Sequence, residues 1–249
     1  MLNGARRLPF CALLRPIRRA LLVAFLLPLA HVAAAQTITS AAYTDPTTRY
    51  AHGILGDAIE HGALVIKLSN AKTVTITLPK SDVFEDTAPR LLDVDADGSP
   101  EVVVVQSNAR LGAKLTIYDE TGLVAATPNI GRSNRWLAPL GAADLDGDGL
   151  IELAYIDRPH LAKTLMIWRF ESGELRFVSE LAGYTNHRIG ERDIAGGIRT
   201  CNGMPEMIVA RADWSEMAAI TFDDKGFVAK TIGQGTSRPA FATAMTCND

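Results

Sequence analysis

The 249-residue sequence lacks the short motifs that mark the common catalytic centres. No G-x-S-x-G, H-E-x-x-H or C-x-x-C pattern occurs, so nothing indicates a hydrolase elbow, a zinc-protease helix or a thioredoxin-like redox site. The histidines do not pair at metal-ligand spacing, apart from the loosely spaced His52 and His61, which we expect at the surface. No stretch keeps a 3.6-residue apolar period, which predicts little helix.

Long apolar runs are also scarce, and the only one lies near the N-terminus. Five arginines and no acidic residue accompany "ALLVAFLLPLA", and "AAA" precedes Gln36. This pattern predicts a signal peptide at residues 1–35. An uncleaved anchor is the alternative, but the run is shorter than the roughly 20 residues of a bilayer span and contains Pro28. We expect a periplasmic or secreted protein with no membrane span after cleavage.

Basic residues are in the minority once residues 1–35 are removed. The remaining 20 Lys and Arg stand against 28 Asp and Glu, a net charge of −8. Binding to nucleic acid needs a basic surface, so nucleic acid is not expected as a partner.

Cysteine is nearly absent. Cys11 lies in the predicted leader, which leaves Cys201 and Cys247. An even count in an oxidising compartment predicts one disulfide, with two free thiols as the alternative. In the chain-entropy model, closing a loop of this length contributes roughly 4 kcal/mol.

A repeat of about fifty residues organises the rest of the chain. Asp93 to Asp144 and Glu101 to Glu152 are both 51 residues, and similar strand-rich segments follow each acidic stretch. We predict one domain at residues 36–249. Its expected parts are units at about 48–80, 83–128, 134–181 and 186–232, and a closing strand at 238–247.

Each unit carries three or four short strands rich in Val, Ile and Thr and bounded by Gly, Asp and Asn. Repeated antiparallel sheets of this size suggest propeller blades, which close radially and so avoid long exposed edges. The expected fold class is therefore all-β, a small β-propeller-like array of about four blades. A β-sandwich or an open array of sheets is the alternative.

Two acidic loops, "DVDADGSPE" and "DLDGDGLIE", carry the metal prediction. Several carboxylates and a backbone carbonyl match the hard oxygens that Ca²⁺ accepts. Valine or tyrosine at the twelfth position rules out an EF-hand. The alternative interpretation is a solvated acidic turn that binds no metal. We predict two Ca²⁺ sites, with ligands Asp93, Asp95, Asp97, Ser99 and Glu101 in the first loop and Asp144, Asp146, Asp148, Leu150 and Glu152 in the second.

These loops resemble the FG-GAP/VCBS-type repeats that also form calcium-binding blades in the integrin α-subunit β-propeller. The resemblance is strong over residues 83–128 and 134–181, weak over 186–232 and only suggestive over 48–80. It implies propeller blades and calcium with a structural role, and it supplies no substrate. Neither copy has a clear FG-GAP tetrapeptide, and four units fall short of the seven of an integrin propeller.

Aromatic, histidine and charged residues recur where each unit begins. If the units are blades, these positions gather on one face, where arginines could hold an anionic group. Packing between blades is the alternative interpretation. The candidate ligand-binding residues are Arg49, Arg135, Trp136, His187, Arg188 and Glu191.

The sequence therefore favours a calcium-stabilised binding or scaffold module over an enzyme. Its partner would be a protein, a glycan or a small anion, and a monomer is expected. The rival hypothesis is a small hydrolase or lyase, which requires His187 and Glu191 to converge with Arg49 or Arg135 in one open pocket. A purely structural envelope scaffold would have no such pocket.

Overall fold

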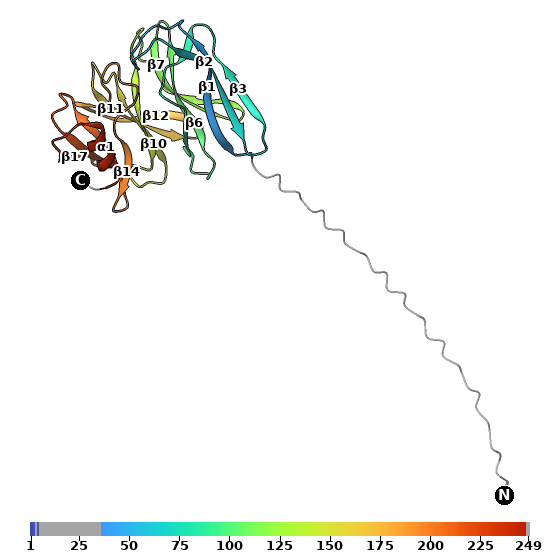
Figure 1. Cartoon of the computed structure of the whole chain (residues 1–249). Helices are drawn as coiled ribbons and strands as arrows, with labels where there is room; N and C mark the ends of the chain where they lie inside the picture. The colour runs from blue at the N-terminus through green and yellow to red at the C-terminus, as the bar shows by residue number, and fades with distance from the viewer. Residues whose placement is uncertain (3, 5–35, 248–249) are drawn as a thin grey trace. The chain divides into compact units, whose positions relative to one another are not determined.

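Seventeen strands and one short helix make up the described part of the chain, which comprises residues 1, 2, 4 and 36–247 of this computed structural model. The predicted signal peptide falls almost wholly outside the described residues. All strand pairs are antiparallel, and they form three hydrogen-bonded sheets within residues 36–247 (Figure 1). The predicted all-β, β-propeller-like class agrees with this arrangement.

The first sheet contains eight strands in the order β1-β2-β4-β6-β7-β8, with β3 paired to β2 and β5 to β6. The strands are β1 Ile38–Thr47, β2 Glu60–Leu68, β3 Thr73–Thr77, β4 Asp82–Phe84, β5 Arg90–Leu92, β6 Glu101–Asn108, β7 Gly112–Asp119 and β8 Gly122–Ala126.

Strand β4 corrects the predicted boundary between the first two units. All three of its residues are buried, and it pairs with both β2 and β6. The segments 48–80 and 83–128 therefore join in one hydrogen-bonded sheet. This sheet also begins at Ile38, before the first predicted unit.

The second and third sheets follow in chain order. The second runs β12-β11-β10-β9, and the third runs β13-β15-β16-β17 with β14 paired to β15. Their strands are β9 Leu137–Ala143, β10 Ile151–Asp157, β11 Thr164–Glu171, β12 Glu174–Ala182, β13 Tyr184–Thr185, β14 Gly197–Cys201, β15 Met204–Arg211, β16 Met217–Asp223 and β17 Gly226–Gly233.

Apolar side chains pack between neighbouring sheets. Val103 and Leu115 of the first sheet share a buried cluster with Leu153 of the second. Ile156 of the second sheet shares another cluster with Met207 of the third. Strands β6 and β10 are buried along nearly their whole length, so their side chains join successive sheets face to face, as blades pack in a propeller-like fold.

The predicted closing strand at 238–247 is wrong, because this segment forms helix α1, Arg238–Met245. Ser237 caps the helix by accepting a hydrogen bond from the Ala240 backbone N–H, and a proline lies in the first turn, where its missing N–H is not needed. Phe241 is buried against the third sheet. None of the helices in the described residues is long and apolar enough to cross a membrane.

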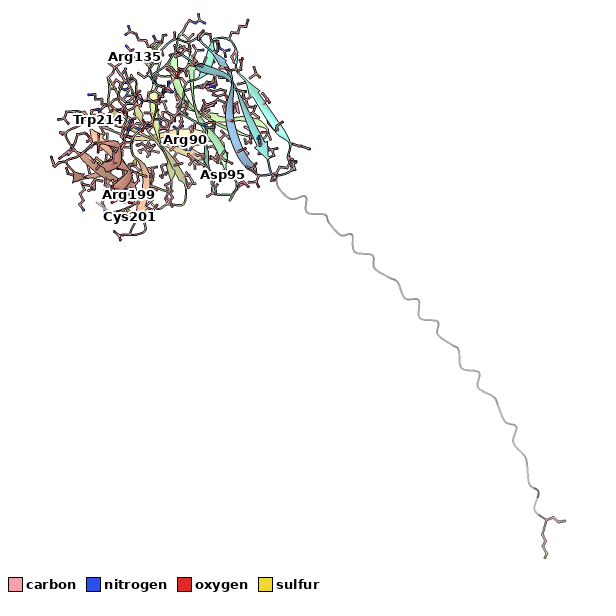
Figure 2. All side chains as sticks on the ribbon, viewed as in Figure 1. Arg90, Asp95, Arg135, Arg199, Cys201 and Trp214 are labelled. Carbon is pink, nitrogen blue, oxygen red and sulfur yellow. A yellow bond between two sulfur atoms is a disulfide. The ribbon has the colours of Figure 1, made fainter. Side chains whose placement is uncertain are left out.

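A disulfide fastens the end of this helix to the third sheet. Cys201, at the end of β14, is bonded to Cys247, with Cα atoms 6.0 Å apart. Figure 2 shows Cys201 beside Arg199 of the same strand. Arg199 pairs with Glu206 across the hairpin at 2.8 Å and also donates to the carbonyl oxygen of Ala244 in the helix. Strand β14 therefore holds the end of the helix by a disulfide and by a hydrogen bond.

Candidate functional site

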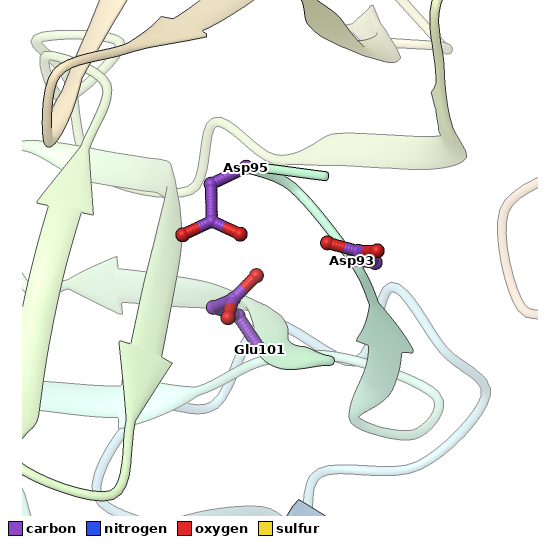
Figure 3. A group of neighbouring side chains, drawn as sticks. All are labelled: Asp93, Asp95 and Glu101. Carbon is purple, nitrogen blue, oxygen red and sulfur yellow. The ribbon is translucent and has the colours of Figure 1, made fainter. Parts of the chain in front are cut away.

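The first acidic loop joins β5 to β6 and gathers carboxylates at one point. Oxygens of Asp93, Asp95 and Glu101 all lie within 4.8 Å of one another (Figure 3). The Gly98 backbone N–H donates to Asp93 at 3.0 Å, and the Val94 N–H donates to Glu101 at 2.9 Å. Gly98 has a φ of +89°, which the sharp turn requires and which glycine adopts without strain.

This loop has no cation of its own among the described residues. None of the ion pairs between described side chains involves its carboxylates. Burial, together with the nearby charges of Asp95, Asp97 and Asp93, raises the pKa of Glu101 to about 7. The crowded carboxylates thus repel one another at neutral pH, and a bound cation would relieve that repulsion.

The second loop, between β9 and β10, has the same backbone design. Oxygens of Asp144, Asp146 and Glu152 lie within 4.8 Å of one another. The Gly149 N–H donates to Asp144 at 3.0 Å, matching the bond from Gly98 to Asp93. The Leu145 N–H donates to Glu152 at 2.8 Å, as Val94 does to Glu101. The 51-residue repeat of the sequence is therefore a repeat of geometry.

An arginine distinguishes the second loop from the first. The Arg169 guanidinium on β11 lies 2.5 Å from Asp146, 2.9 Å from Asp148 and 2.6 Å from Glu152. Strand register explains this, because Glu152 pairs with Arg169 across β10 and β11. Built-in positive charge thus already compensates the second loop.

The corresponding position beside the first loop is not basic. Val102 pairs with Tyr118, so continuing the register by one residue brings Asp119 opposite Glu101. The Asp119 carboxylate accepts hydrogen bonds from the backbone N–H groups of Thr121 and Gly122 in the turn after β7. It is therefore engaged locally and supplies no countercharge.

The donor sets suit a hard divalent cation, though not equally. Each loop brings three carboxylates together, and these are the oxygen ligands that Ca²⁺ prefers. Asp97 and Asp148 stand outside the converging groups and accept from backbone N–H groups of their own turns. The first loop offers its carboxylates without displacing another cation, whereas a cation in the second loop would have to displace Arg169.

A pocket of about 190 Å³ lies elsewhere, where loops from all three sheets meet. Figure 2 shows Arg135, which lines this pocket, well separated from Asp95 of the first acidic loop. The lining residues are His52, Ile54, Asn134, Arg135, Trp136, Arg158, His160, Leu161 and Ile189.

Only part of the predicted ligand-binding set reaches this pocket. Arg135 and Trp136 line it, and His187 is buried against Trp136 with ring centroids 4.9 Å apart. Arg49 instead donates to the backbone carbonyl of Asp82 at 2.6 Å.

Arg188 and Glu191 are also committed elsewhere. The Arg188 guanidinium stacks on Trp214 at 3.7 Å from the ring centroid, and the Glu191 carboxylate pairs with Arg238. His187 bonds the backbone carbonyl of Glu191 rather than its carboxylate. The Glu191 carboxylate also lies 3.7 Å from Arg188, so His187, Arg188 and Glu191 are neighbours, whereas Arg49 is bound to Asp82.

The candidate ligand-binding set left out four polar residues of the pocket: His52, Asn134, Arg158 and His160. His52, which we expected at the surface, has a side chain only 14% exposed, and its Nδ1 donates to the buried Glu85 carboxylate at 2.5 Å. The two residues are 33 apart in sequence, and no local pattern signals such a pair. The loop after β10 holds Arg158 and His160, and nothing in its sequence marked it.

The histidine pair at the back of the pocket has a defined proton arrangement. His187 Nε2 lies 2.8 Å from the Glu191 carbonyl oxygen, which only accepts, so Nε2 carries the hydrogen. In neutral His187, Nδ1 then accepts from His160 Nε2 at 3.1 Å. Burial lowers the pKa of His160 to about 4 and also lowers the pKa of His187, so both rings are neutral at pH 7.

Comparison with known proteins bears on the acidic loops. Residues 93–155 match the family model of the FG-GAP-like repeat, a span that contains both loops and the strands between them. The chain thus contains an FG-GAP-like repeat over these residues. Among curated proteins, none matches it in sequence.

Proposed function

We propose that the chain is a calcium-stabilised, β-propeller-like binding module. The observation that carries this proposal is the first acidic loop, where three carboxylates converge with no cation among the described residues. Two features add support: the FG-GAP-like match includes this loop, and the chain has a pocket at which loops of three sheets meet.

Calcium in the first loop would be held by carboxylates and one main-chain oxygen. Asp93, Asp95, Asp97 and Glu101 supply carboxylates, and Ser99 supplies its carbonyl. The ion would neutralise charges that repel one another and would tie β5 to β6. Because a ligand that binds only the folded state stabilises it, free calcium at 100 times the dissociation constant contributes about 2.7 kcal/mol.

The second loop offers Asp144, Asp146, Asp148, Glu152 and the carbonyl of Leu150. Here the Arg169 guanidinium provides the countercharge, so calcium must break three ion pairs before it gains its ligands. We therefore propose a strong calcium site in the first loop and a weak one in the second, in place of two equivalent sites.

Thermal melting with and without calcium tests this scaffold. The melting temperature of the purified protein should rise with calcium and fall with EGTA, because ion binding is linked to folding. Asp95→Asn should abolish the response. Asp224→Asn, in the exposed turn between β16 and β17, should retain it. Equal melting temperatures in calcium and EGTA would rule out a calcium-stabilised scaffold.

We also propose export to the periplasm or beyond the cell. The disulfide between Cys201 and Cys247 is of the kind that persists in oxidising compartments, and the sequence of residues 1–35 has the pattern of a signal peptide. Mass spectrometry of the protein from its native host should find an N-terminus at Gln36. A cytoplasmic protein that keeps residues 1–35 would refute export.

A binding function is favoured over the rival hydrolase or lyase. That hypothesis needed His187 and Glu191 to converge with Arg49 or Arg135, yet Arg49 and the Glu191 carboxylate are bound elsewhere. The proposed partner class remains a protein, a glycan or a small anion, bound by a monomer, and the net charge of residues 36–249 disfavours nucleic acid.

A further inference from the structure

The pocket lies where connections from different sheets meet. His52 and Ile54 come from the segment between β1 and β2, and Arg135 from the segment before β9. His160 follows β10, and Ile189 follows β13. Ligand sites are commonly built at such a meeting of loops on a rigid scaffold, because side chains distant in sequence converge there.

Hydrogen bonds fix the back wall before any ligand arrives. Trp136 Nε1–H donates to the carbonyl oxygen of Glu85 at 2.8 Å, and its ring stacks edge-on against the buried His187. The carboxylate of Glu85 orients His52 and also accepts a hydrogen bond from Ser107. A preformed wall lowers the entropy that binding must overcome.

The rim of the pocket exposes apolar surface. Leu161 is 62% exposed and Ile189 is 70% exposed, although both are large aliphatic side chains. Ile54 and Trp136 extend this apolar surface inward. A ligand with an apolar body would cover these side chains and release the water that now contacts them.

Within the described part of the chain, one positive charge in the pocket, that of Arg135, has no carboxylate partner. Asp157 neutralises Arg158 through a bidentate pair, and Glu85 accompanies His52. His160 is neutral because burial lowers its pKa. Arg135 donates only to the backbone carbonyl of Asn134 among the described residues.

The other arginines of the described chain show how unusual this is. Each is paired with a carboxylate except Arg110, Arg132 and Arg135, and the first two are exposed. Arg135 is the partly buried member of these three, and it lines a pocket. Its guanidinium, which is not paired with a carboxylate among the described residues, is suited to bind the two oxygens of a ligand carboxylate.

We propose that this pocket binds a small carboxylate with an apolar body, the carboxylate on Arg135 and the body against Trp136, Leu161 and Ile189. This assignment rests on the proposed binding function and names the ligand class. His52 and His160 also line the pocket, and bonds to Glu85 and His187 respectively fix the orientation of their rings.

Binding of matched probes tests the proposal. Benzoate and benzamide have nearly the same shape but differ in charge, and hexanoate offers a carboxylate on an aliphatic body. Titration calorimetry in calcium buffer should give benzoate a dissociation constant at least about tenfold lower than benzamide, since a charge-assisted pair exceeds a neutral contact by this much.

Variants distinguish charge from shape. Arg135→Gln should weaken benzoate about tenfold and leave benzamide unchanged. Arg132→Gln, on the same loop but exposed and outside the pocket, should change neither. Ile189→Ser, at the exposed rim, should weaken both probes alike. Equal effects of Arg135→Gln and Arg132→Gln on benzoate would overturn the carboxylate assignment.

The pocket proposal and the calcium-scaffold proposal can be refuted independently of each other. A wild-type protein whose melting temperature responds to calcium, but which binds neither benzoate nor hexanoate, overturns the pocket proposal alone. The opposite result is carboxylate binding that depends on Arg135, in a protein whose melting temperature does not respond to calcium. It would support the pocket proposal and overturn the calcium-stabilised scaffold.

Discussion

Replacing Arg169 with glutamine should convert the second acidic loop into a copy of the first. One guanidinium pairs there with Asp146, Asp148 and Glu152. Glutamine keeps a polar side chain on β11 but removes the charge. In calcium-free buffer the loop would then hold four carboxylates without a cation.

The expected loss of stability follows from how deeply the partners are buried. The Glu152 side chain has no exposed surface and Arg169 is 20% exposed, whereas Asp148 is 40% exposed and contributes little. Removing one partner of a buried pair typically costs about 3 to 5 kcal/mol. Because Arg169 is partly exposed, we expect about 3 kcal/mol, which lowers the melting temperature of a domain this size by roughly 6 to 12 °C.

Calcium should reverse the effect. Calorimetric titration should find one tightly bound calcium per wild-type chain and two in Arg169→Gln, and added calcium should restore most of the lost melting temperature. Arg176→Gln is the matched control, since this β12 arginine is 60% exposed in its ion pair with Glu171. The reasoning is refuted if Arg169→Gln binds no more calcium than the wild type. It is also refuted if Arg169→Gln and Arg176→Gln have the same melting temperature in EGTA.

Two further predictions concern the disulfide and the partly buried His160. Cys247→Ser should lower the free energy of unfolding by up to roughly 4 kcal/mol, because it opens a loop spanning 46 residues; an unchanged urea midpoint would contradict this. Burial lowers the pKa of His160 from 6.5 to about 4, so the native protein binds fewer protons than the unfolded chain and loses stability as pH falls through that range. His160→Gln should remove up to about 3 kcal/mol of that loss between pH 7.5 and 4.5, and denaturation curves that shift with pH as in the wild type would contradict it.

The acidic loops and the strand-rich architecture could be predicted because their signals are local. Carboxylates at alternate positions followed by glycine specify a turn within nine residues, and the 51-residue repeat reveals the second copy. The disulfide could be predicted because only two cysteines, Cys201 and Cys247, remain after residues 1–35. Arg169 was not singled out, because it stands 17 residues after Glu152 and meets it only through the register of β10 and β11.

The pocket and the chain end could not be predicted, for different reasons. The polar residues of the pocket come from separate loops, so their meeting depends on how the three sheets pack. Helix α1 has eight residues, too few for an apolar period to show, and only its cap and first-turn proline signal it. Strand β4 has three residues, so nothing in its sequence showed that it would join two predicted units.

A crystal structure of the protein grown with calcium tests the central claim most directly. We expect an ion in the first loop, with oxygens of Asp93, Asp95 and Glu101 at about 2.3 to 2.6 Å, while Arg169 stays paired with Glu152 in the second. Calcium absent from the first loop, or present in the second with Arg169 displaced, would contradict the account.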